Sequence, residues 1–207
     1  MVRLIVFDLG KVLVNFDFNI AVRRLKERCP VDMVRAYSLF KNSDLAENWD
    51  KGEIPPETFF ATIQKEMRLS VTQAEFRDIW NGIFTEKTDM IELARSLNRN
   101  NRVYVLSNVN PWHAEHLRKT YPWLGEFDGF VASCDVKLVK PDPAIFRLVL
   151  KKTGTAPGEV FYVDDIAEHV RAARKLGIDG HVFKGASGLV EELNKRNLLE
   201  DGAGPAG

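Results

Sequence analysis

The feature that most constrains the fold of this chain is a set of short apolar runs that alternate with helical patterns. Residues 2–7 form a continuous apolar run that ends at Asp8, which is typical of a strand buried on both faces of a parallel sheet. Similar runs predict strands at 102–107, 129–133, 160–164 and 180–183, and amphipathic patterns predict helices at about 87–99, 111–120, 143–153, 166–176 and 187–197. This alternation predicts an α/β fold with a doubly wound parallel sheet.

One long interval interrupts the alternation. Residues 18–85 contain several helical patterns and no convincing strand, so we expect a helical insert there. The insert leaves the sheet just after Asp8, at the strand edge where open α/β sheets bind ligands. We expect it to act as a lid, with a packed subdomain that does not touch ligand as the alternative. The predicted divisions are a core of 1–17 and 86–200, an insert of 18–85, and a disordered tail of 201–207.

Polar side chains follow four of the predicted strands, at or shortly after the point where each strand ends. They are Asp8, Ser107 and Asn108, Lys140, and the pair Asp164 and Asp165. Each of them alone would be an ordinary turn or helix-cap residue. Because the carboxyl ends of parallel strands meet at one edge of a sheet, we expect these side chains to form a single site.

The residue types indicate the chemistry of that site. Three carboxylates placed close together repel one another unless a cation neutralises them, and oxygen ligands without His or Cys favour Mg²⁺. A cation beside Lys140 suits a phosphate, to which Ser107 and Asn108 can donate hydrogen bonds. One carboxylate is then free to attack phosphorus and form an aspartyl-phosphate. The cation and Lys140 would keep Asp8 ionised at neutral pH.

Four stretches of the sequence occur in a fixed order between residues 6 and 165. They are Val6-Phe-Asp8-Leu-Gly-Lys-Val-Leu-Val14, Leu106-Ser107-Asn108, Lys140-Pro141-Asp-Pro-Ala-Ile-Phe146 and Val163-Asp164-Asp165. Together they resemble the four motifs of the haloacid dehalogenase-like hydrolase superfamily, and the insert resembles the small helical cap of its first cap class. The resemblance implies a Rossmann-like core with an inserted cap.

The resemblance also implies a role for each site residue. Asp8 would be the nucleophile, and the backbone carbonyl of Gly10 would be an Mg²⁺ ligand. Asp165 would bind the metal directly, whereas Asp164 would act through Lys140 or a metal-bound water. The phosphoryl group would be held by Ser107, Asn108 and Lys140, with Lys140 also a catalytic group beside Asp8.

Gly10 departs from the pattern of the superfamily. Phosphatases of this kind usually carry a second Asp at that position, which protonates the leaving group and then activates water. General acid–base catalysis is worth ~10²–10⁴ in rate, so its loss costs roughly 3–5 kcal/mol unless another group replaces it. Three outcomes are open: an acid elsewhere, for example on the insert, a substrate with a good leaving group such as an anomeric sugar phosphate, or slow or absent hydrolysis.

Further residues favour the sugar-phosphate outcome. Leu-Gly-x-Val at residues 9–12, followed by Asn15-Phe-Asp17-Phe-Asn19, resembles a bacterial subgroup of sugar-phosphate phosphatases of the glucose-1-phosphate type. In that subgroup a Ser-Asn-x-Asn stretch precedes a His, and here Ser107-Asn-Val-Asn110 precedes His113. The resemblance implies that His113 binds substrate, and a helix-surface histidine is the alternative.

We therefore predict an Mg²⁺-dependent phosphatase that acts on a small phosphorylated metabolite, such as a sugar phosphate. One alternative is a non-catalytic phosphate-binding or regulatory protein. Another is a 2-haloacid dehalogenase, against which Asp164 and Asp165 argue because that reaction needs no Mg²⁺.

The composition bears on partners and location. Lys plus Arg and Asp plus Glu both number 29, so a balanced charge gives no general attraction to nucleic acid or anionic lipid. We expect neither as a partner. The sequence has no signal-peptide pattern and no apolar run long enough to span a membrane, and Cys29 and Cys134 are expected to be free thiols. These features predict a cytoplasmic protein, and the sequence does not indicate its oligomeric state.

Overall fold

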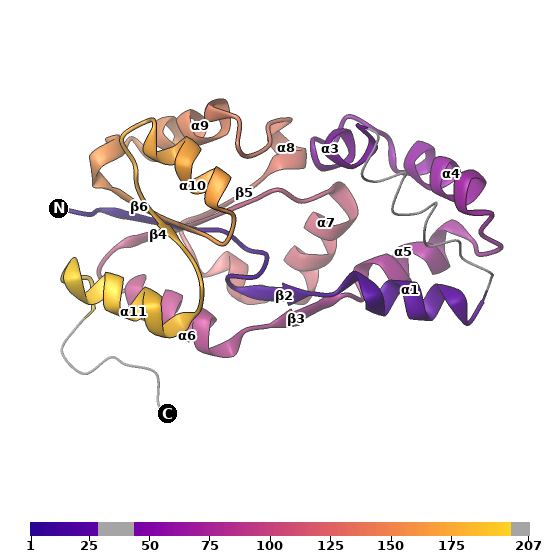
Figure 1. Cartoon of the computed structure of the whole chain (residues 1–207), viewed down its shortest axis with the longest axis horizontal. Coiled ribbons are helices and arrows are strands. Elements are labelled where there is room, and N and C mark those ends of the chain that lie inside the picture. The colour runs from indigo at the N-terminus through magenta and orange to yellow at the C-terminus, as the bar shows by residue number, and fades with distance from the viewer. Residues whose placement is uncertain (29–43, 200–207) are drawn as a thin grey trace.

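The structure is a computed structural model that describes residues 1–28 and 44–199. Its main sheet has five parallel strands in the order β5-β4-β1-β6-β7 (Figure 1). The strands are β1 (Leu4–Phe7), β4 (Arg102–Ser107), β5 (Gly129–Ala132), β6 (Val160–Asp164) and β7 (Asp179–Val182). Because β1 lies in the centre, the chain first builds one side of the sheet and then the other. The predicted doubly wound α/β fold is confirmed.

Both faces of the sheet are covered by helices. Ile5 and Phe7 face a core shared with α6 (Thr88–Leu97), α7 (Pro111–Thr120) and α11 (Ala186–Lys195). Leu4 and Val6 face the opposite core, which α9 (Pro143–Thr153) and α10 (Ala167–Arg174) complete. All four side chains of β1 are therefore buried, which explains why the strand reads as an unbroken apolar run rather than an alternating one.

The helical insert has a hydrophobic core of its own. Its helices are α1 (Phe18–Lys26), α3 (Leu45–Asp50), α4 (Pro56–Met67) and α5 (Gln73–Asn81). Trp49 and Phe59 stack in this core with ring centroids 4.3 Å apart. Trp112 of α7 enters the same core, so one aromatic side chain from beside the sheet fastens the insert.

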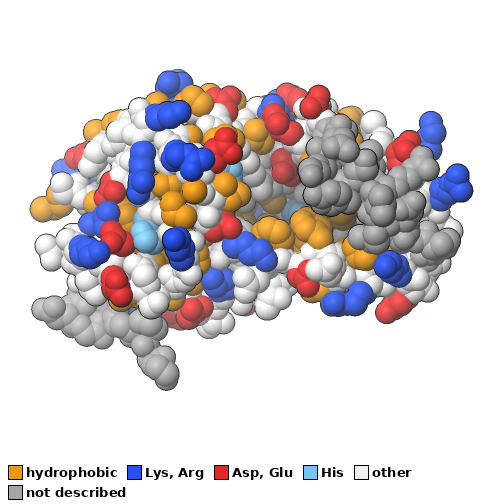
Figure 2. Space-filling view, in the orientation of Figure 1, with side chains coloured by type: hydrophobic (Ala, Val, Ile, Leu, Met, Phe, Trp, Pro, Cys, Tyr) orange, Lys and Arg blue, Asp and Glu red, His pale blue; other side chains and the backbone are white. Residues whose placement is uncertain are grey.

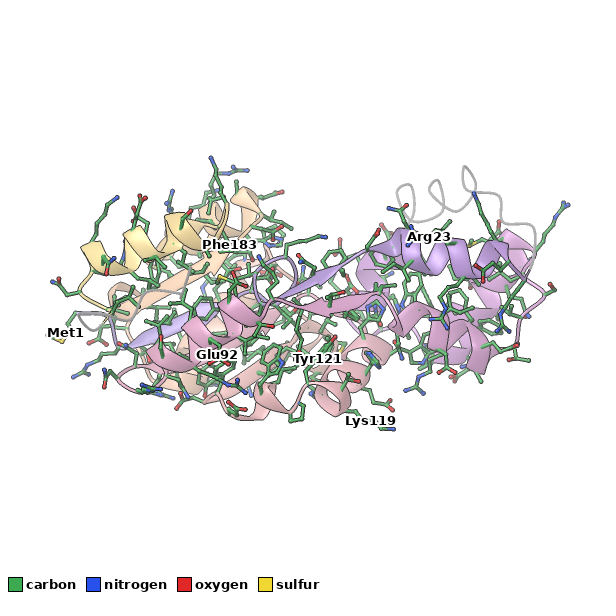
Figure 3. The ribbon with its side chains drawn as sticks, turned by 90° about the horizontal axis from the view of Figure 1, so that it is seen from below. Met1, Arg23, Glu92, Lys119, Tyr121 and Phe183 are labelled. Carbon is green, nitrogen blue, oxygen red and sulfur yellow. The ribbon has the colours of Figure 1, made fainter. Side chains whose placement is uncertain are left out.

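A two-stranded antiparallel ribbon connects the sheet to the insert. It pairs β2 (Val14–Phe16) with β3 (Phe84–Glu86), and it runs between the part that contains Met1 and Phe183 and the part that contains Arg23 (Figure 3). The expectation that 18–85 contains no strand is therefore wrong for its last two residues. The cause is that three-residue strands carry no hydrophobic period and form through their pairing with each other. The domain boundaries stay a prediction.

The carboxyl ends of the sheet strands point toward the helical insert (Figure 1). α8 (Ser133–Val136) follows β5 at this edge and meets α3 of the insert. No helix in the two described stretches has the length and apolar character to cross a bilayer. Cys134 is a free thiol, whereas Cys29 and the predicted tail 201–207 lie outside the described residues.

Candidate active site

The sheet brings the predicted polar residues to one place. Phe7 is opposite Val105 of β4 and Val163 of β6, so the residues that follow these three strands reach the same edge together. Asp8 follows β1, Ser107 ends β4, and Asp164 ends β6. The loop before α9 adds Lys140 to this group. The convergence expected from the parallel sheet is therefore present.

Lys140 lies at the centre of the group and is only 3% exposed. Its ammonium donates to Oδ1 of Asp8 at 2.7 Å, to Oδ2 of Asp164 at 2.7 Å and to the carbonyl of Leu106 at 3.1 Å. Burial would lower the pKa of Lys140, but the charges of Asp8 and Asp164 outweigh burial and raise it. Lys140 is thus a permanent cation whose three donors are all used.

Asp164 is the most heavily bonded carboxylate of the site. It is fully buried, yet it accepts from Lys140, from the hydroxyl of Tyr162, from the backbone N–H of Ile166 at 2.8 Å and from Nδ1 of His169 at 3.0 Å. Burial raises the pKa of a carboxyl, but these hydrogen bonds outweigh burial and hold the pKa of Asp164 well below its usual range. Asp164 is therefore a fixed anion.

Tyr162 and His169 were not predicted as parts of the site. The two-residue period of a strand puts Tyr162 and Asp164 on the same face of β6, and that signal could have identified the tyrosine. His169 lies in the first turn of α10, and its ring reaches back to Asp164. Because a carboxylate only accepts, Nδ1 of His169 carries the proton.

The pKa of Asp8 is shifted in the opposite direction from that of Asp164. Asp8 is 7% exposed, and burial raises its pKa to about 6 against the lowering effect of Lys140, with Asp164 adding to the rise. A pKa of about 6 leaves the carboxyl mostly ionised at neutral pH. Asp8 is therefore an anion with few hydrogen bonds, which is the state that a carboxylate nucleophile requires.

Three carboxylates at this edge form a set suited to a cation. Oxygen atoms of Asp8, Asp164 and Asp165 all lie within 4.8 Å of one another. The pKa of the half-buried Asp165 is raised, mainly by burial and to a smaller extent by the charge of Asp164. Burial is the larger cause of the raised pKa values of Asp8 and Asp165, and the negative charge of Asp164 adds to both. An oxygen-only donor set with excess negative charge fits Mg²⁺.

Ser107 and Asn108 differ in how far their side chains are already engaged. Within the described part of the chain, the Ser107 hydroxyl makes one long contact, of 3.4 Å, with the carbonyl of Asn108. The Asn108 amide donates to the carbonyl of Lys140 and accepts from its backbone N–H, both at 2.8 Å. Asn108 therefore holds the loop that carries Lys140, and it keeps one amide hydrogen for a ligand.

His113 is part of the junction between the sheet and the insert. It is 5% exposed, so the alternative of a helix-surface histidine is wrong. Its Nδ1 accepts from Nδ2 of Asn110 at 2.9 Å, and its Nε2–H donates to the carbonyl of Trp80 at 3.0 Å. Burial lowers the pKa of His113 to about 4, so the ring is neutral. With both nitrogens bonded, His113 fastens α7 to α5, and its predicted contact with substrate remains a prediction.

Two cavities border the site where the sheet meets the insert. One of about 170 Å³ is lined by the polar residues Ser107, Asn108 and Asp50, by Gly10, and by apolar side chains such as Phe16 and Phe84. The other, of about 430 Å³, borders Lys140. On the face shown in Figure 2, basic and acidic side chains are interspersed, and hydrophobic side chains gather near this junction.

Comparison with known proteins gives consistent matches. The family model of haloacid dehalogenase-like hydrolases matches residues 2–177. The chain is 25% identical to a D-ribitol-5-phosphate phosphatase of Bacteroides thetaiotaomicron, over 86% of this chain and 90% of that protein. It is 30% identical to a sesquiterpene phosphatase of Aspergillus oryzae, over 84% of this chain and 86% of that protein.

A solved structure extends the likeness to three dimensions. It is a HAD family enzyme of Bacteroides thetaiotaomicron in complex with magnesium and inorganic phosphate, with a TM-score of 0.77 and 25% identity. The alignment covers 91% of this chain and 99% of that one. With its five-stranded parallel sheet, its carboxylates at the strand ends and a family match over most of its length, the chain belongs to the haloacid dehalogenase-like hydrolases.

Proposed function

We propose that this protein is an Mg²⁺-dependent phosphatase that hydrolyses a small phosphomonoester through an aspartyl-phosphate on Asp8. The observation that carries the proposal is the packing of three carboxylates within 4.8 Å of one another beside the buried ammonium of Lys140. Such a site binds a divalent cation and a phosphoryl group together. The magnesium and phosphate bound to the related Bacteroides enzyme support this choice of ligands.

Each residue then has a part in the reaction. One oxygen of Asp8 attacks phosphorus, and the bond between phosphorus and the ester oxygen breaks. Lys140 neutralises charge beside the attacking carboxylate, while Ser107 and the remaining amide hydrogen of Asn108 hold phosphoryl oxygens. Asp8, Asp165 and the carbonyl of Gly10 would bind Mg²⁺, and Asp164 would act through Lys140 or a metal-bound water. The bound Mg²⁺ would supply positive charge for the phosphoryl oxygens. Water then cleaves the phosphorus–oxygen bond to Asp8 and restores the carboxylate.

The substrate in this proposal is small, such as a sugar phosphate. The cavity beside Gly10 and Ser107 has a volume of about 170 Å³, which is below the about 300–1,000 Å³ of pockets that bind drug-sized ligands. The related ribitol-5-phosphate phosphatase acts on a substrate of this size class. A phosphorylated metabolite also agrees with the predicted cytoplasmic location, which stays a prediction.

The proposal is tested by phosphate release from a panel of phosphate esters in the presence of Mg²⁺. We expect the wild type to release phosphate, and we expect Asp8→Asn and EDTA-treated protein to release none above background. Equal rates of phosphate release by the wild type and Asp8→Asn would show that the protein does not use Asp8 as a phosphatase nucleophile. Chloride release from 2-chloropropionate in the same panel would instead support the dehalogenase alternative.

One observation favours a second candidate, a phosphate-binding protein without turnover. Gly10 offers no proton donor beside the nucleophile. This candidate predicts that calorimetric titration of the Mg²⁺-loaded protein with inorganic phosphate gives saturable binding, while no ester in the panel is hydrolysed.

A further inference from the structure

The proposed reaction lacks an acid at Gly10, and the cavities that border the site contain few groups that could replace it. Both ring nitrogens of His113 are bonded. Glu47 accepts from Lys51 at 2.6 Å, and Asp142 caps α9 by accepting from the backbone N–H of Ala144 at 2.8 Å. Among the described residues that line these cavities, the remaining acid is Asp50, the last residue of α3.

Asp50 faces both cavities at once. It lines the cavity of about 170 Å³ together with Gly10 and Ser107, and it lines the cavity of about 430 Å³ together with Lys140. Asn108 borders both cavities as well, so Asp50 shares each cavity with residues of the proposed phosphoryl site. No hydrogen bond or ion pair to the Asp50 carboxyl comes from the rest of the described chain, 1–28 and 44–199.

The backbone of Asp50 is fixed to the core. Its carbonyl accepts from the hydroxyl of Ser133 at 2.6 Å, and Ser133 is fully buried and also accepts from the backbone N–H of Val109 at 2.8 Å. Two residues later, Gly52 has φ +65° and packs so closely that a Cβ would lie 2.6 Å from the carbonyl oxygen of Cys134. A residue with a side chain could not make that approach. The end of α3 is therefore docked on α8 beside the site.

The surroundings of Asp50 favour the protonated carboxyl. Burial raises its pKa to about 7, in a half-buried position at the negative end of a short helix. The charged groups around the larger cavity are Glu47, Lys51, Lys140 and Asp142, and Lys140 is already paired with two carboxylates. An acid that is half protonated near neutral pH is matched to both giving and taking a proton.

We propose that Asp50, supplied by the helical insert, is the general acid and base that replaces the missing side chain at Gly10. In the first step Asp8 bonds to phosphorus, the ester P–O bond breaks, and the Asp50 carboxyl gives its proton to the leaving oxygen. In the second step a water oxygen attacks phosphorus, its proton passes to the Asp50 carboxylate, and the bond to Asp8 breaks. Both residues return to their starting states. This inference rests on the proposed phosphatase function.

The test compares leaving groups, because only a poor leaving group needs an acid. Asp50→Asn, the wild type and the matched control Glu47→Gln are assayed with Mg²⁺ on 4-nitrophenyl phosphate and on alkyl and sugar phosphates. For Asp50→Asn we expect kcat on alkyl phosphates to fall by ~10²–10⁴, a much smaller fall on 4-nitrophenyl phosphate, and little change in KM. We expect Glu47→Gln to behave as the wild type.

Other outcomes separate the two proposals. If Asp50→Asn lost the same factor on every ester, or mainly raised KM, Asp50 would be a substrate-binding or structural residue and the inference would be overturned. If the wild type were no better than Asp8→Asn on any ester, the phosphatase function itself would be wrong. Circular dichroism checks folding, and Asp50→Glu, which keeps the acid, is expected to recover part of the alkyl phosphatase rate if the role is chemical and none if it is not.

Discussion

The ring of Phe16 fills the space where a side chain of residue 10 would lie. A Cβ at Gly10 would be 2.8 Å from Cε1 of Phe16, which is closer than such atoms approach in proteins. Phe16 belongs to β2 and packs against Phe18 and Phe84, with ring centroids 5.7 and 6.4 Å apart. The ribbon that carries the insert therefore uses the space that an Asp at position 10 would need.

The first prediction follows from this contact. Gly10→Asp alone is expected to lower the free energy of unfolding by about 1–3 kcal/mol and not to raise turnover, because the new side chain must displace Phe16. Gly10→Asp combined with Phe16→Ala makes room for the carboxyl, and in an Asp50→Asn background we expect the pair to hydrolyse alkyl phosphates faster than Phe16→Ala alone. Urea unfolding and kcat measure the two effects. A stable, faster Gly10→Asp single variant would contradict the steric argument.

The second prediction concerns Lys140. Lys140→Met keeps the length of the side chain but leaves Asp8 and Asp164 buried without their cation. Removing one partner of a buried ion pair costs about 3–5 kcal/mol, so we expect a loss of that size in metal-free protein together with loss of phosphatase activity. Urea unfolding in EDTA measures the stability, and the exposed Lys151→Met on α9 is the matched control. Equal stability of the two variants would show that the pairing contributes little.

Much of the sheet could be predicted because a strand that is buried on both faces appears in the sequence as a continuous apolar run. The predicted strands at 102–107 and 160–164 match β4 and β6, whose side chains are mostly buried. The convergence of Asp8, Lys140 and Asp164 could also be expected, because parallel strands end at one edge. These inferences need only local pattern and sheet geometry.

The remaining features depend on contacts between distant segments. β3 forms only because β2 pairs with it. Asn110 lies three residues before His113, which the sequence shows, but the second partner of His113 is a backbone carbonyl of α5 that no pattern reveals. Asp50 looks like any acid at the end of a helix, and its place beside Gly10 comes from the docking of α3 on Ser133.

The third prediction separates the metal-free and metal-bound states through Asp165. The charge on Asp165 is disfavoured by burial and by Asp164, so Asp165→Asn is expected to make metal-free protein slightly more stable at pH 7. With Mg²⁺ at 100 times its Kd, the wild type should gain about 2.7 kcal/mol, and the variant should gain far less because it lacks a ligand. Thermal unfolding with EDTA and with Mg²⁺ measures both, with the exposed Asp89→Asn as control. If Mg²⁺ stabilised the wild type and Asp165→Asn by the same amount, Asp165 would be excluded as a ligand.

The fourth prediction is the pH dependence of kcat/KM for alkyl phosphates. The reaction needs Asp50 protonated, and its pKa is raised to about 7, so the rate is expected to fall as pH rises through about 7. Asp50→Asn should be slow and should lose this alkaline limb. Because Lys51 and Lys140 keep their charge over this range, they do not produce the same limb. An alkaline limb that persists unchanged in Asp50→Asn would assign the titration to another group.

The fifth prediction uses His113 as a reporter of the junction between the sheet and the insert. Its pKa falls from about 6.5 in the unfolded chain to about 4 in the fold, so between these values the unfolded state binds more protons and stability falls as pH falls. Over this pH range the titration of His113 lowers the free energy of unfolding by about 3 kcal/mol in total. His113→Gln, which does not titrate, should be less stable than the wild type at pH 7, and that difference should shrink toward pH 4. Urea unfolding at several pH values measures it, and His116→Gln on the same helix, at a more exposed site, should show a smaller change. A difference that stayed constant with pH would mean that His113 is accessible to protons in the folded protein and does not hold α7 to α5 as a neutral ring.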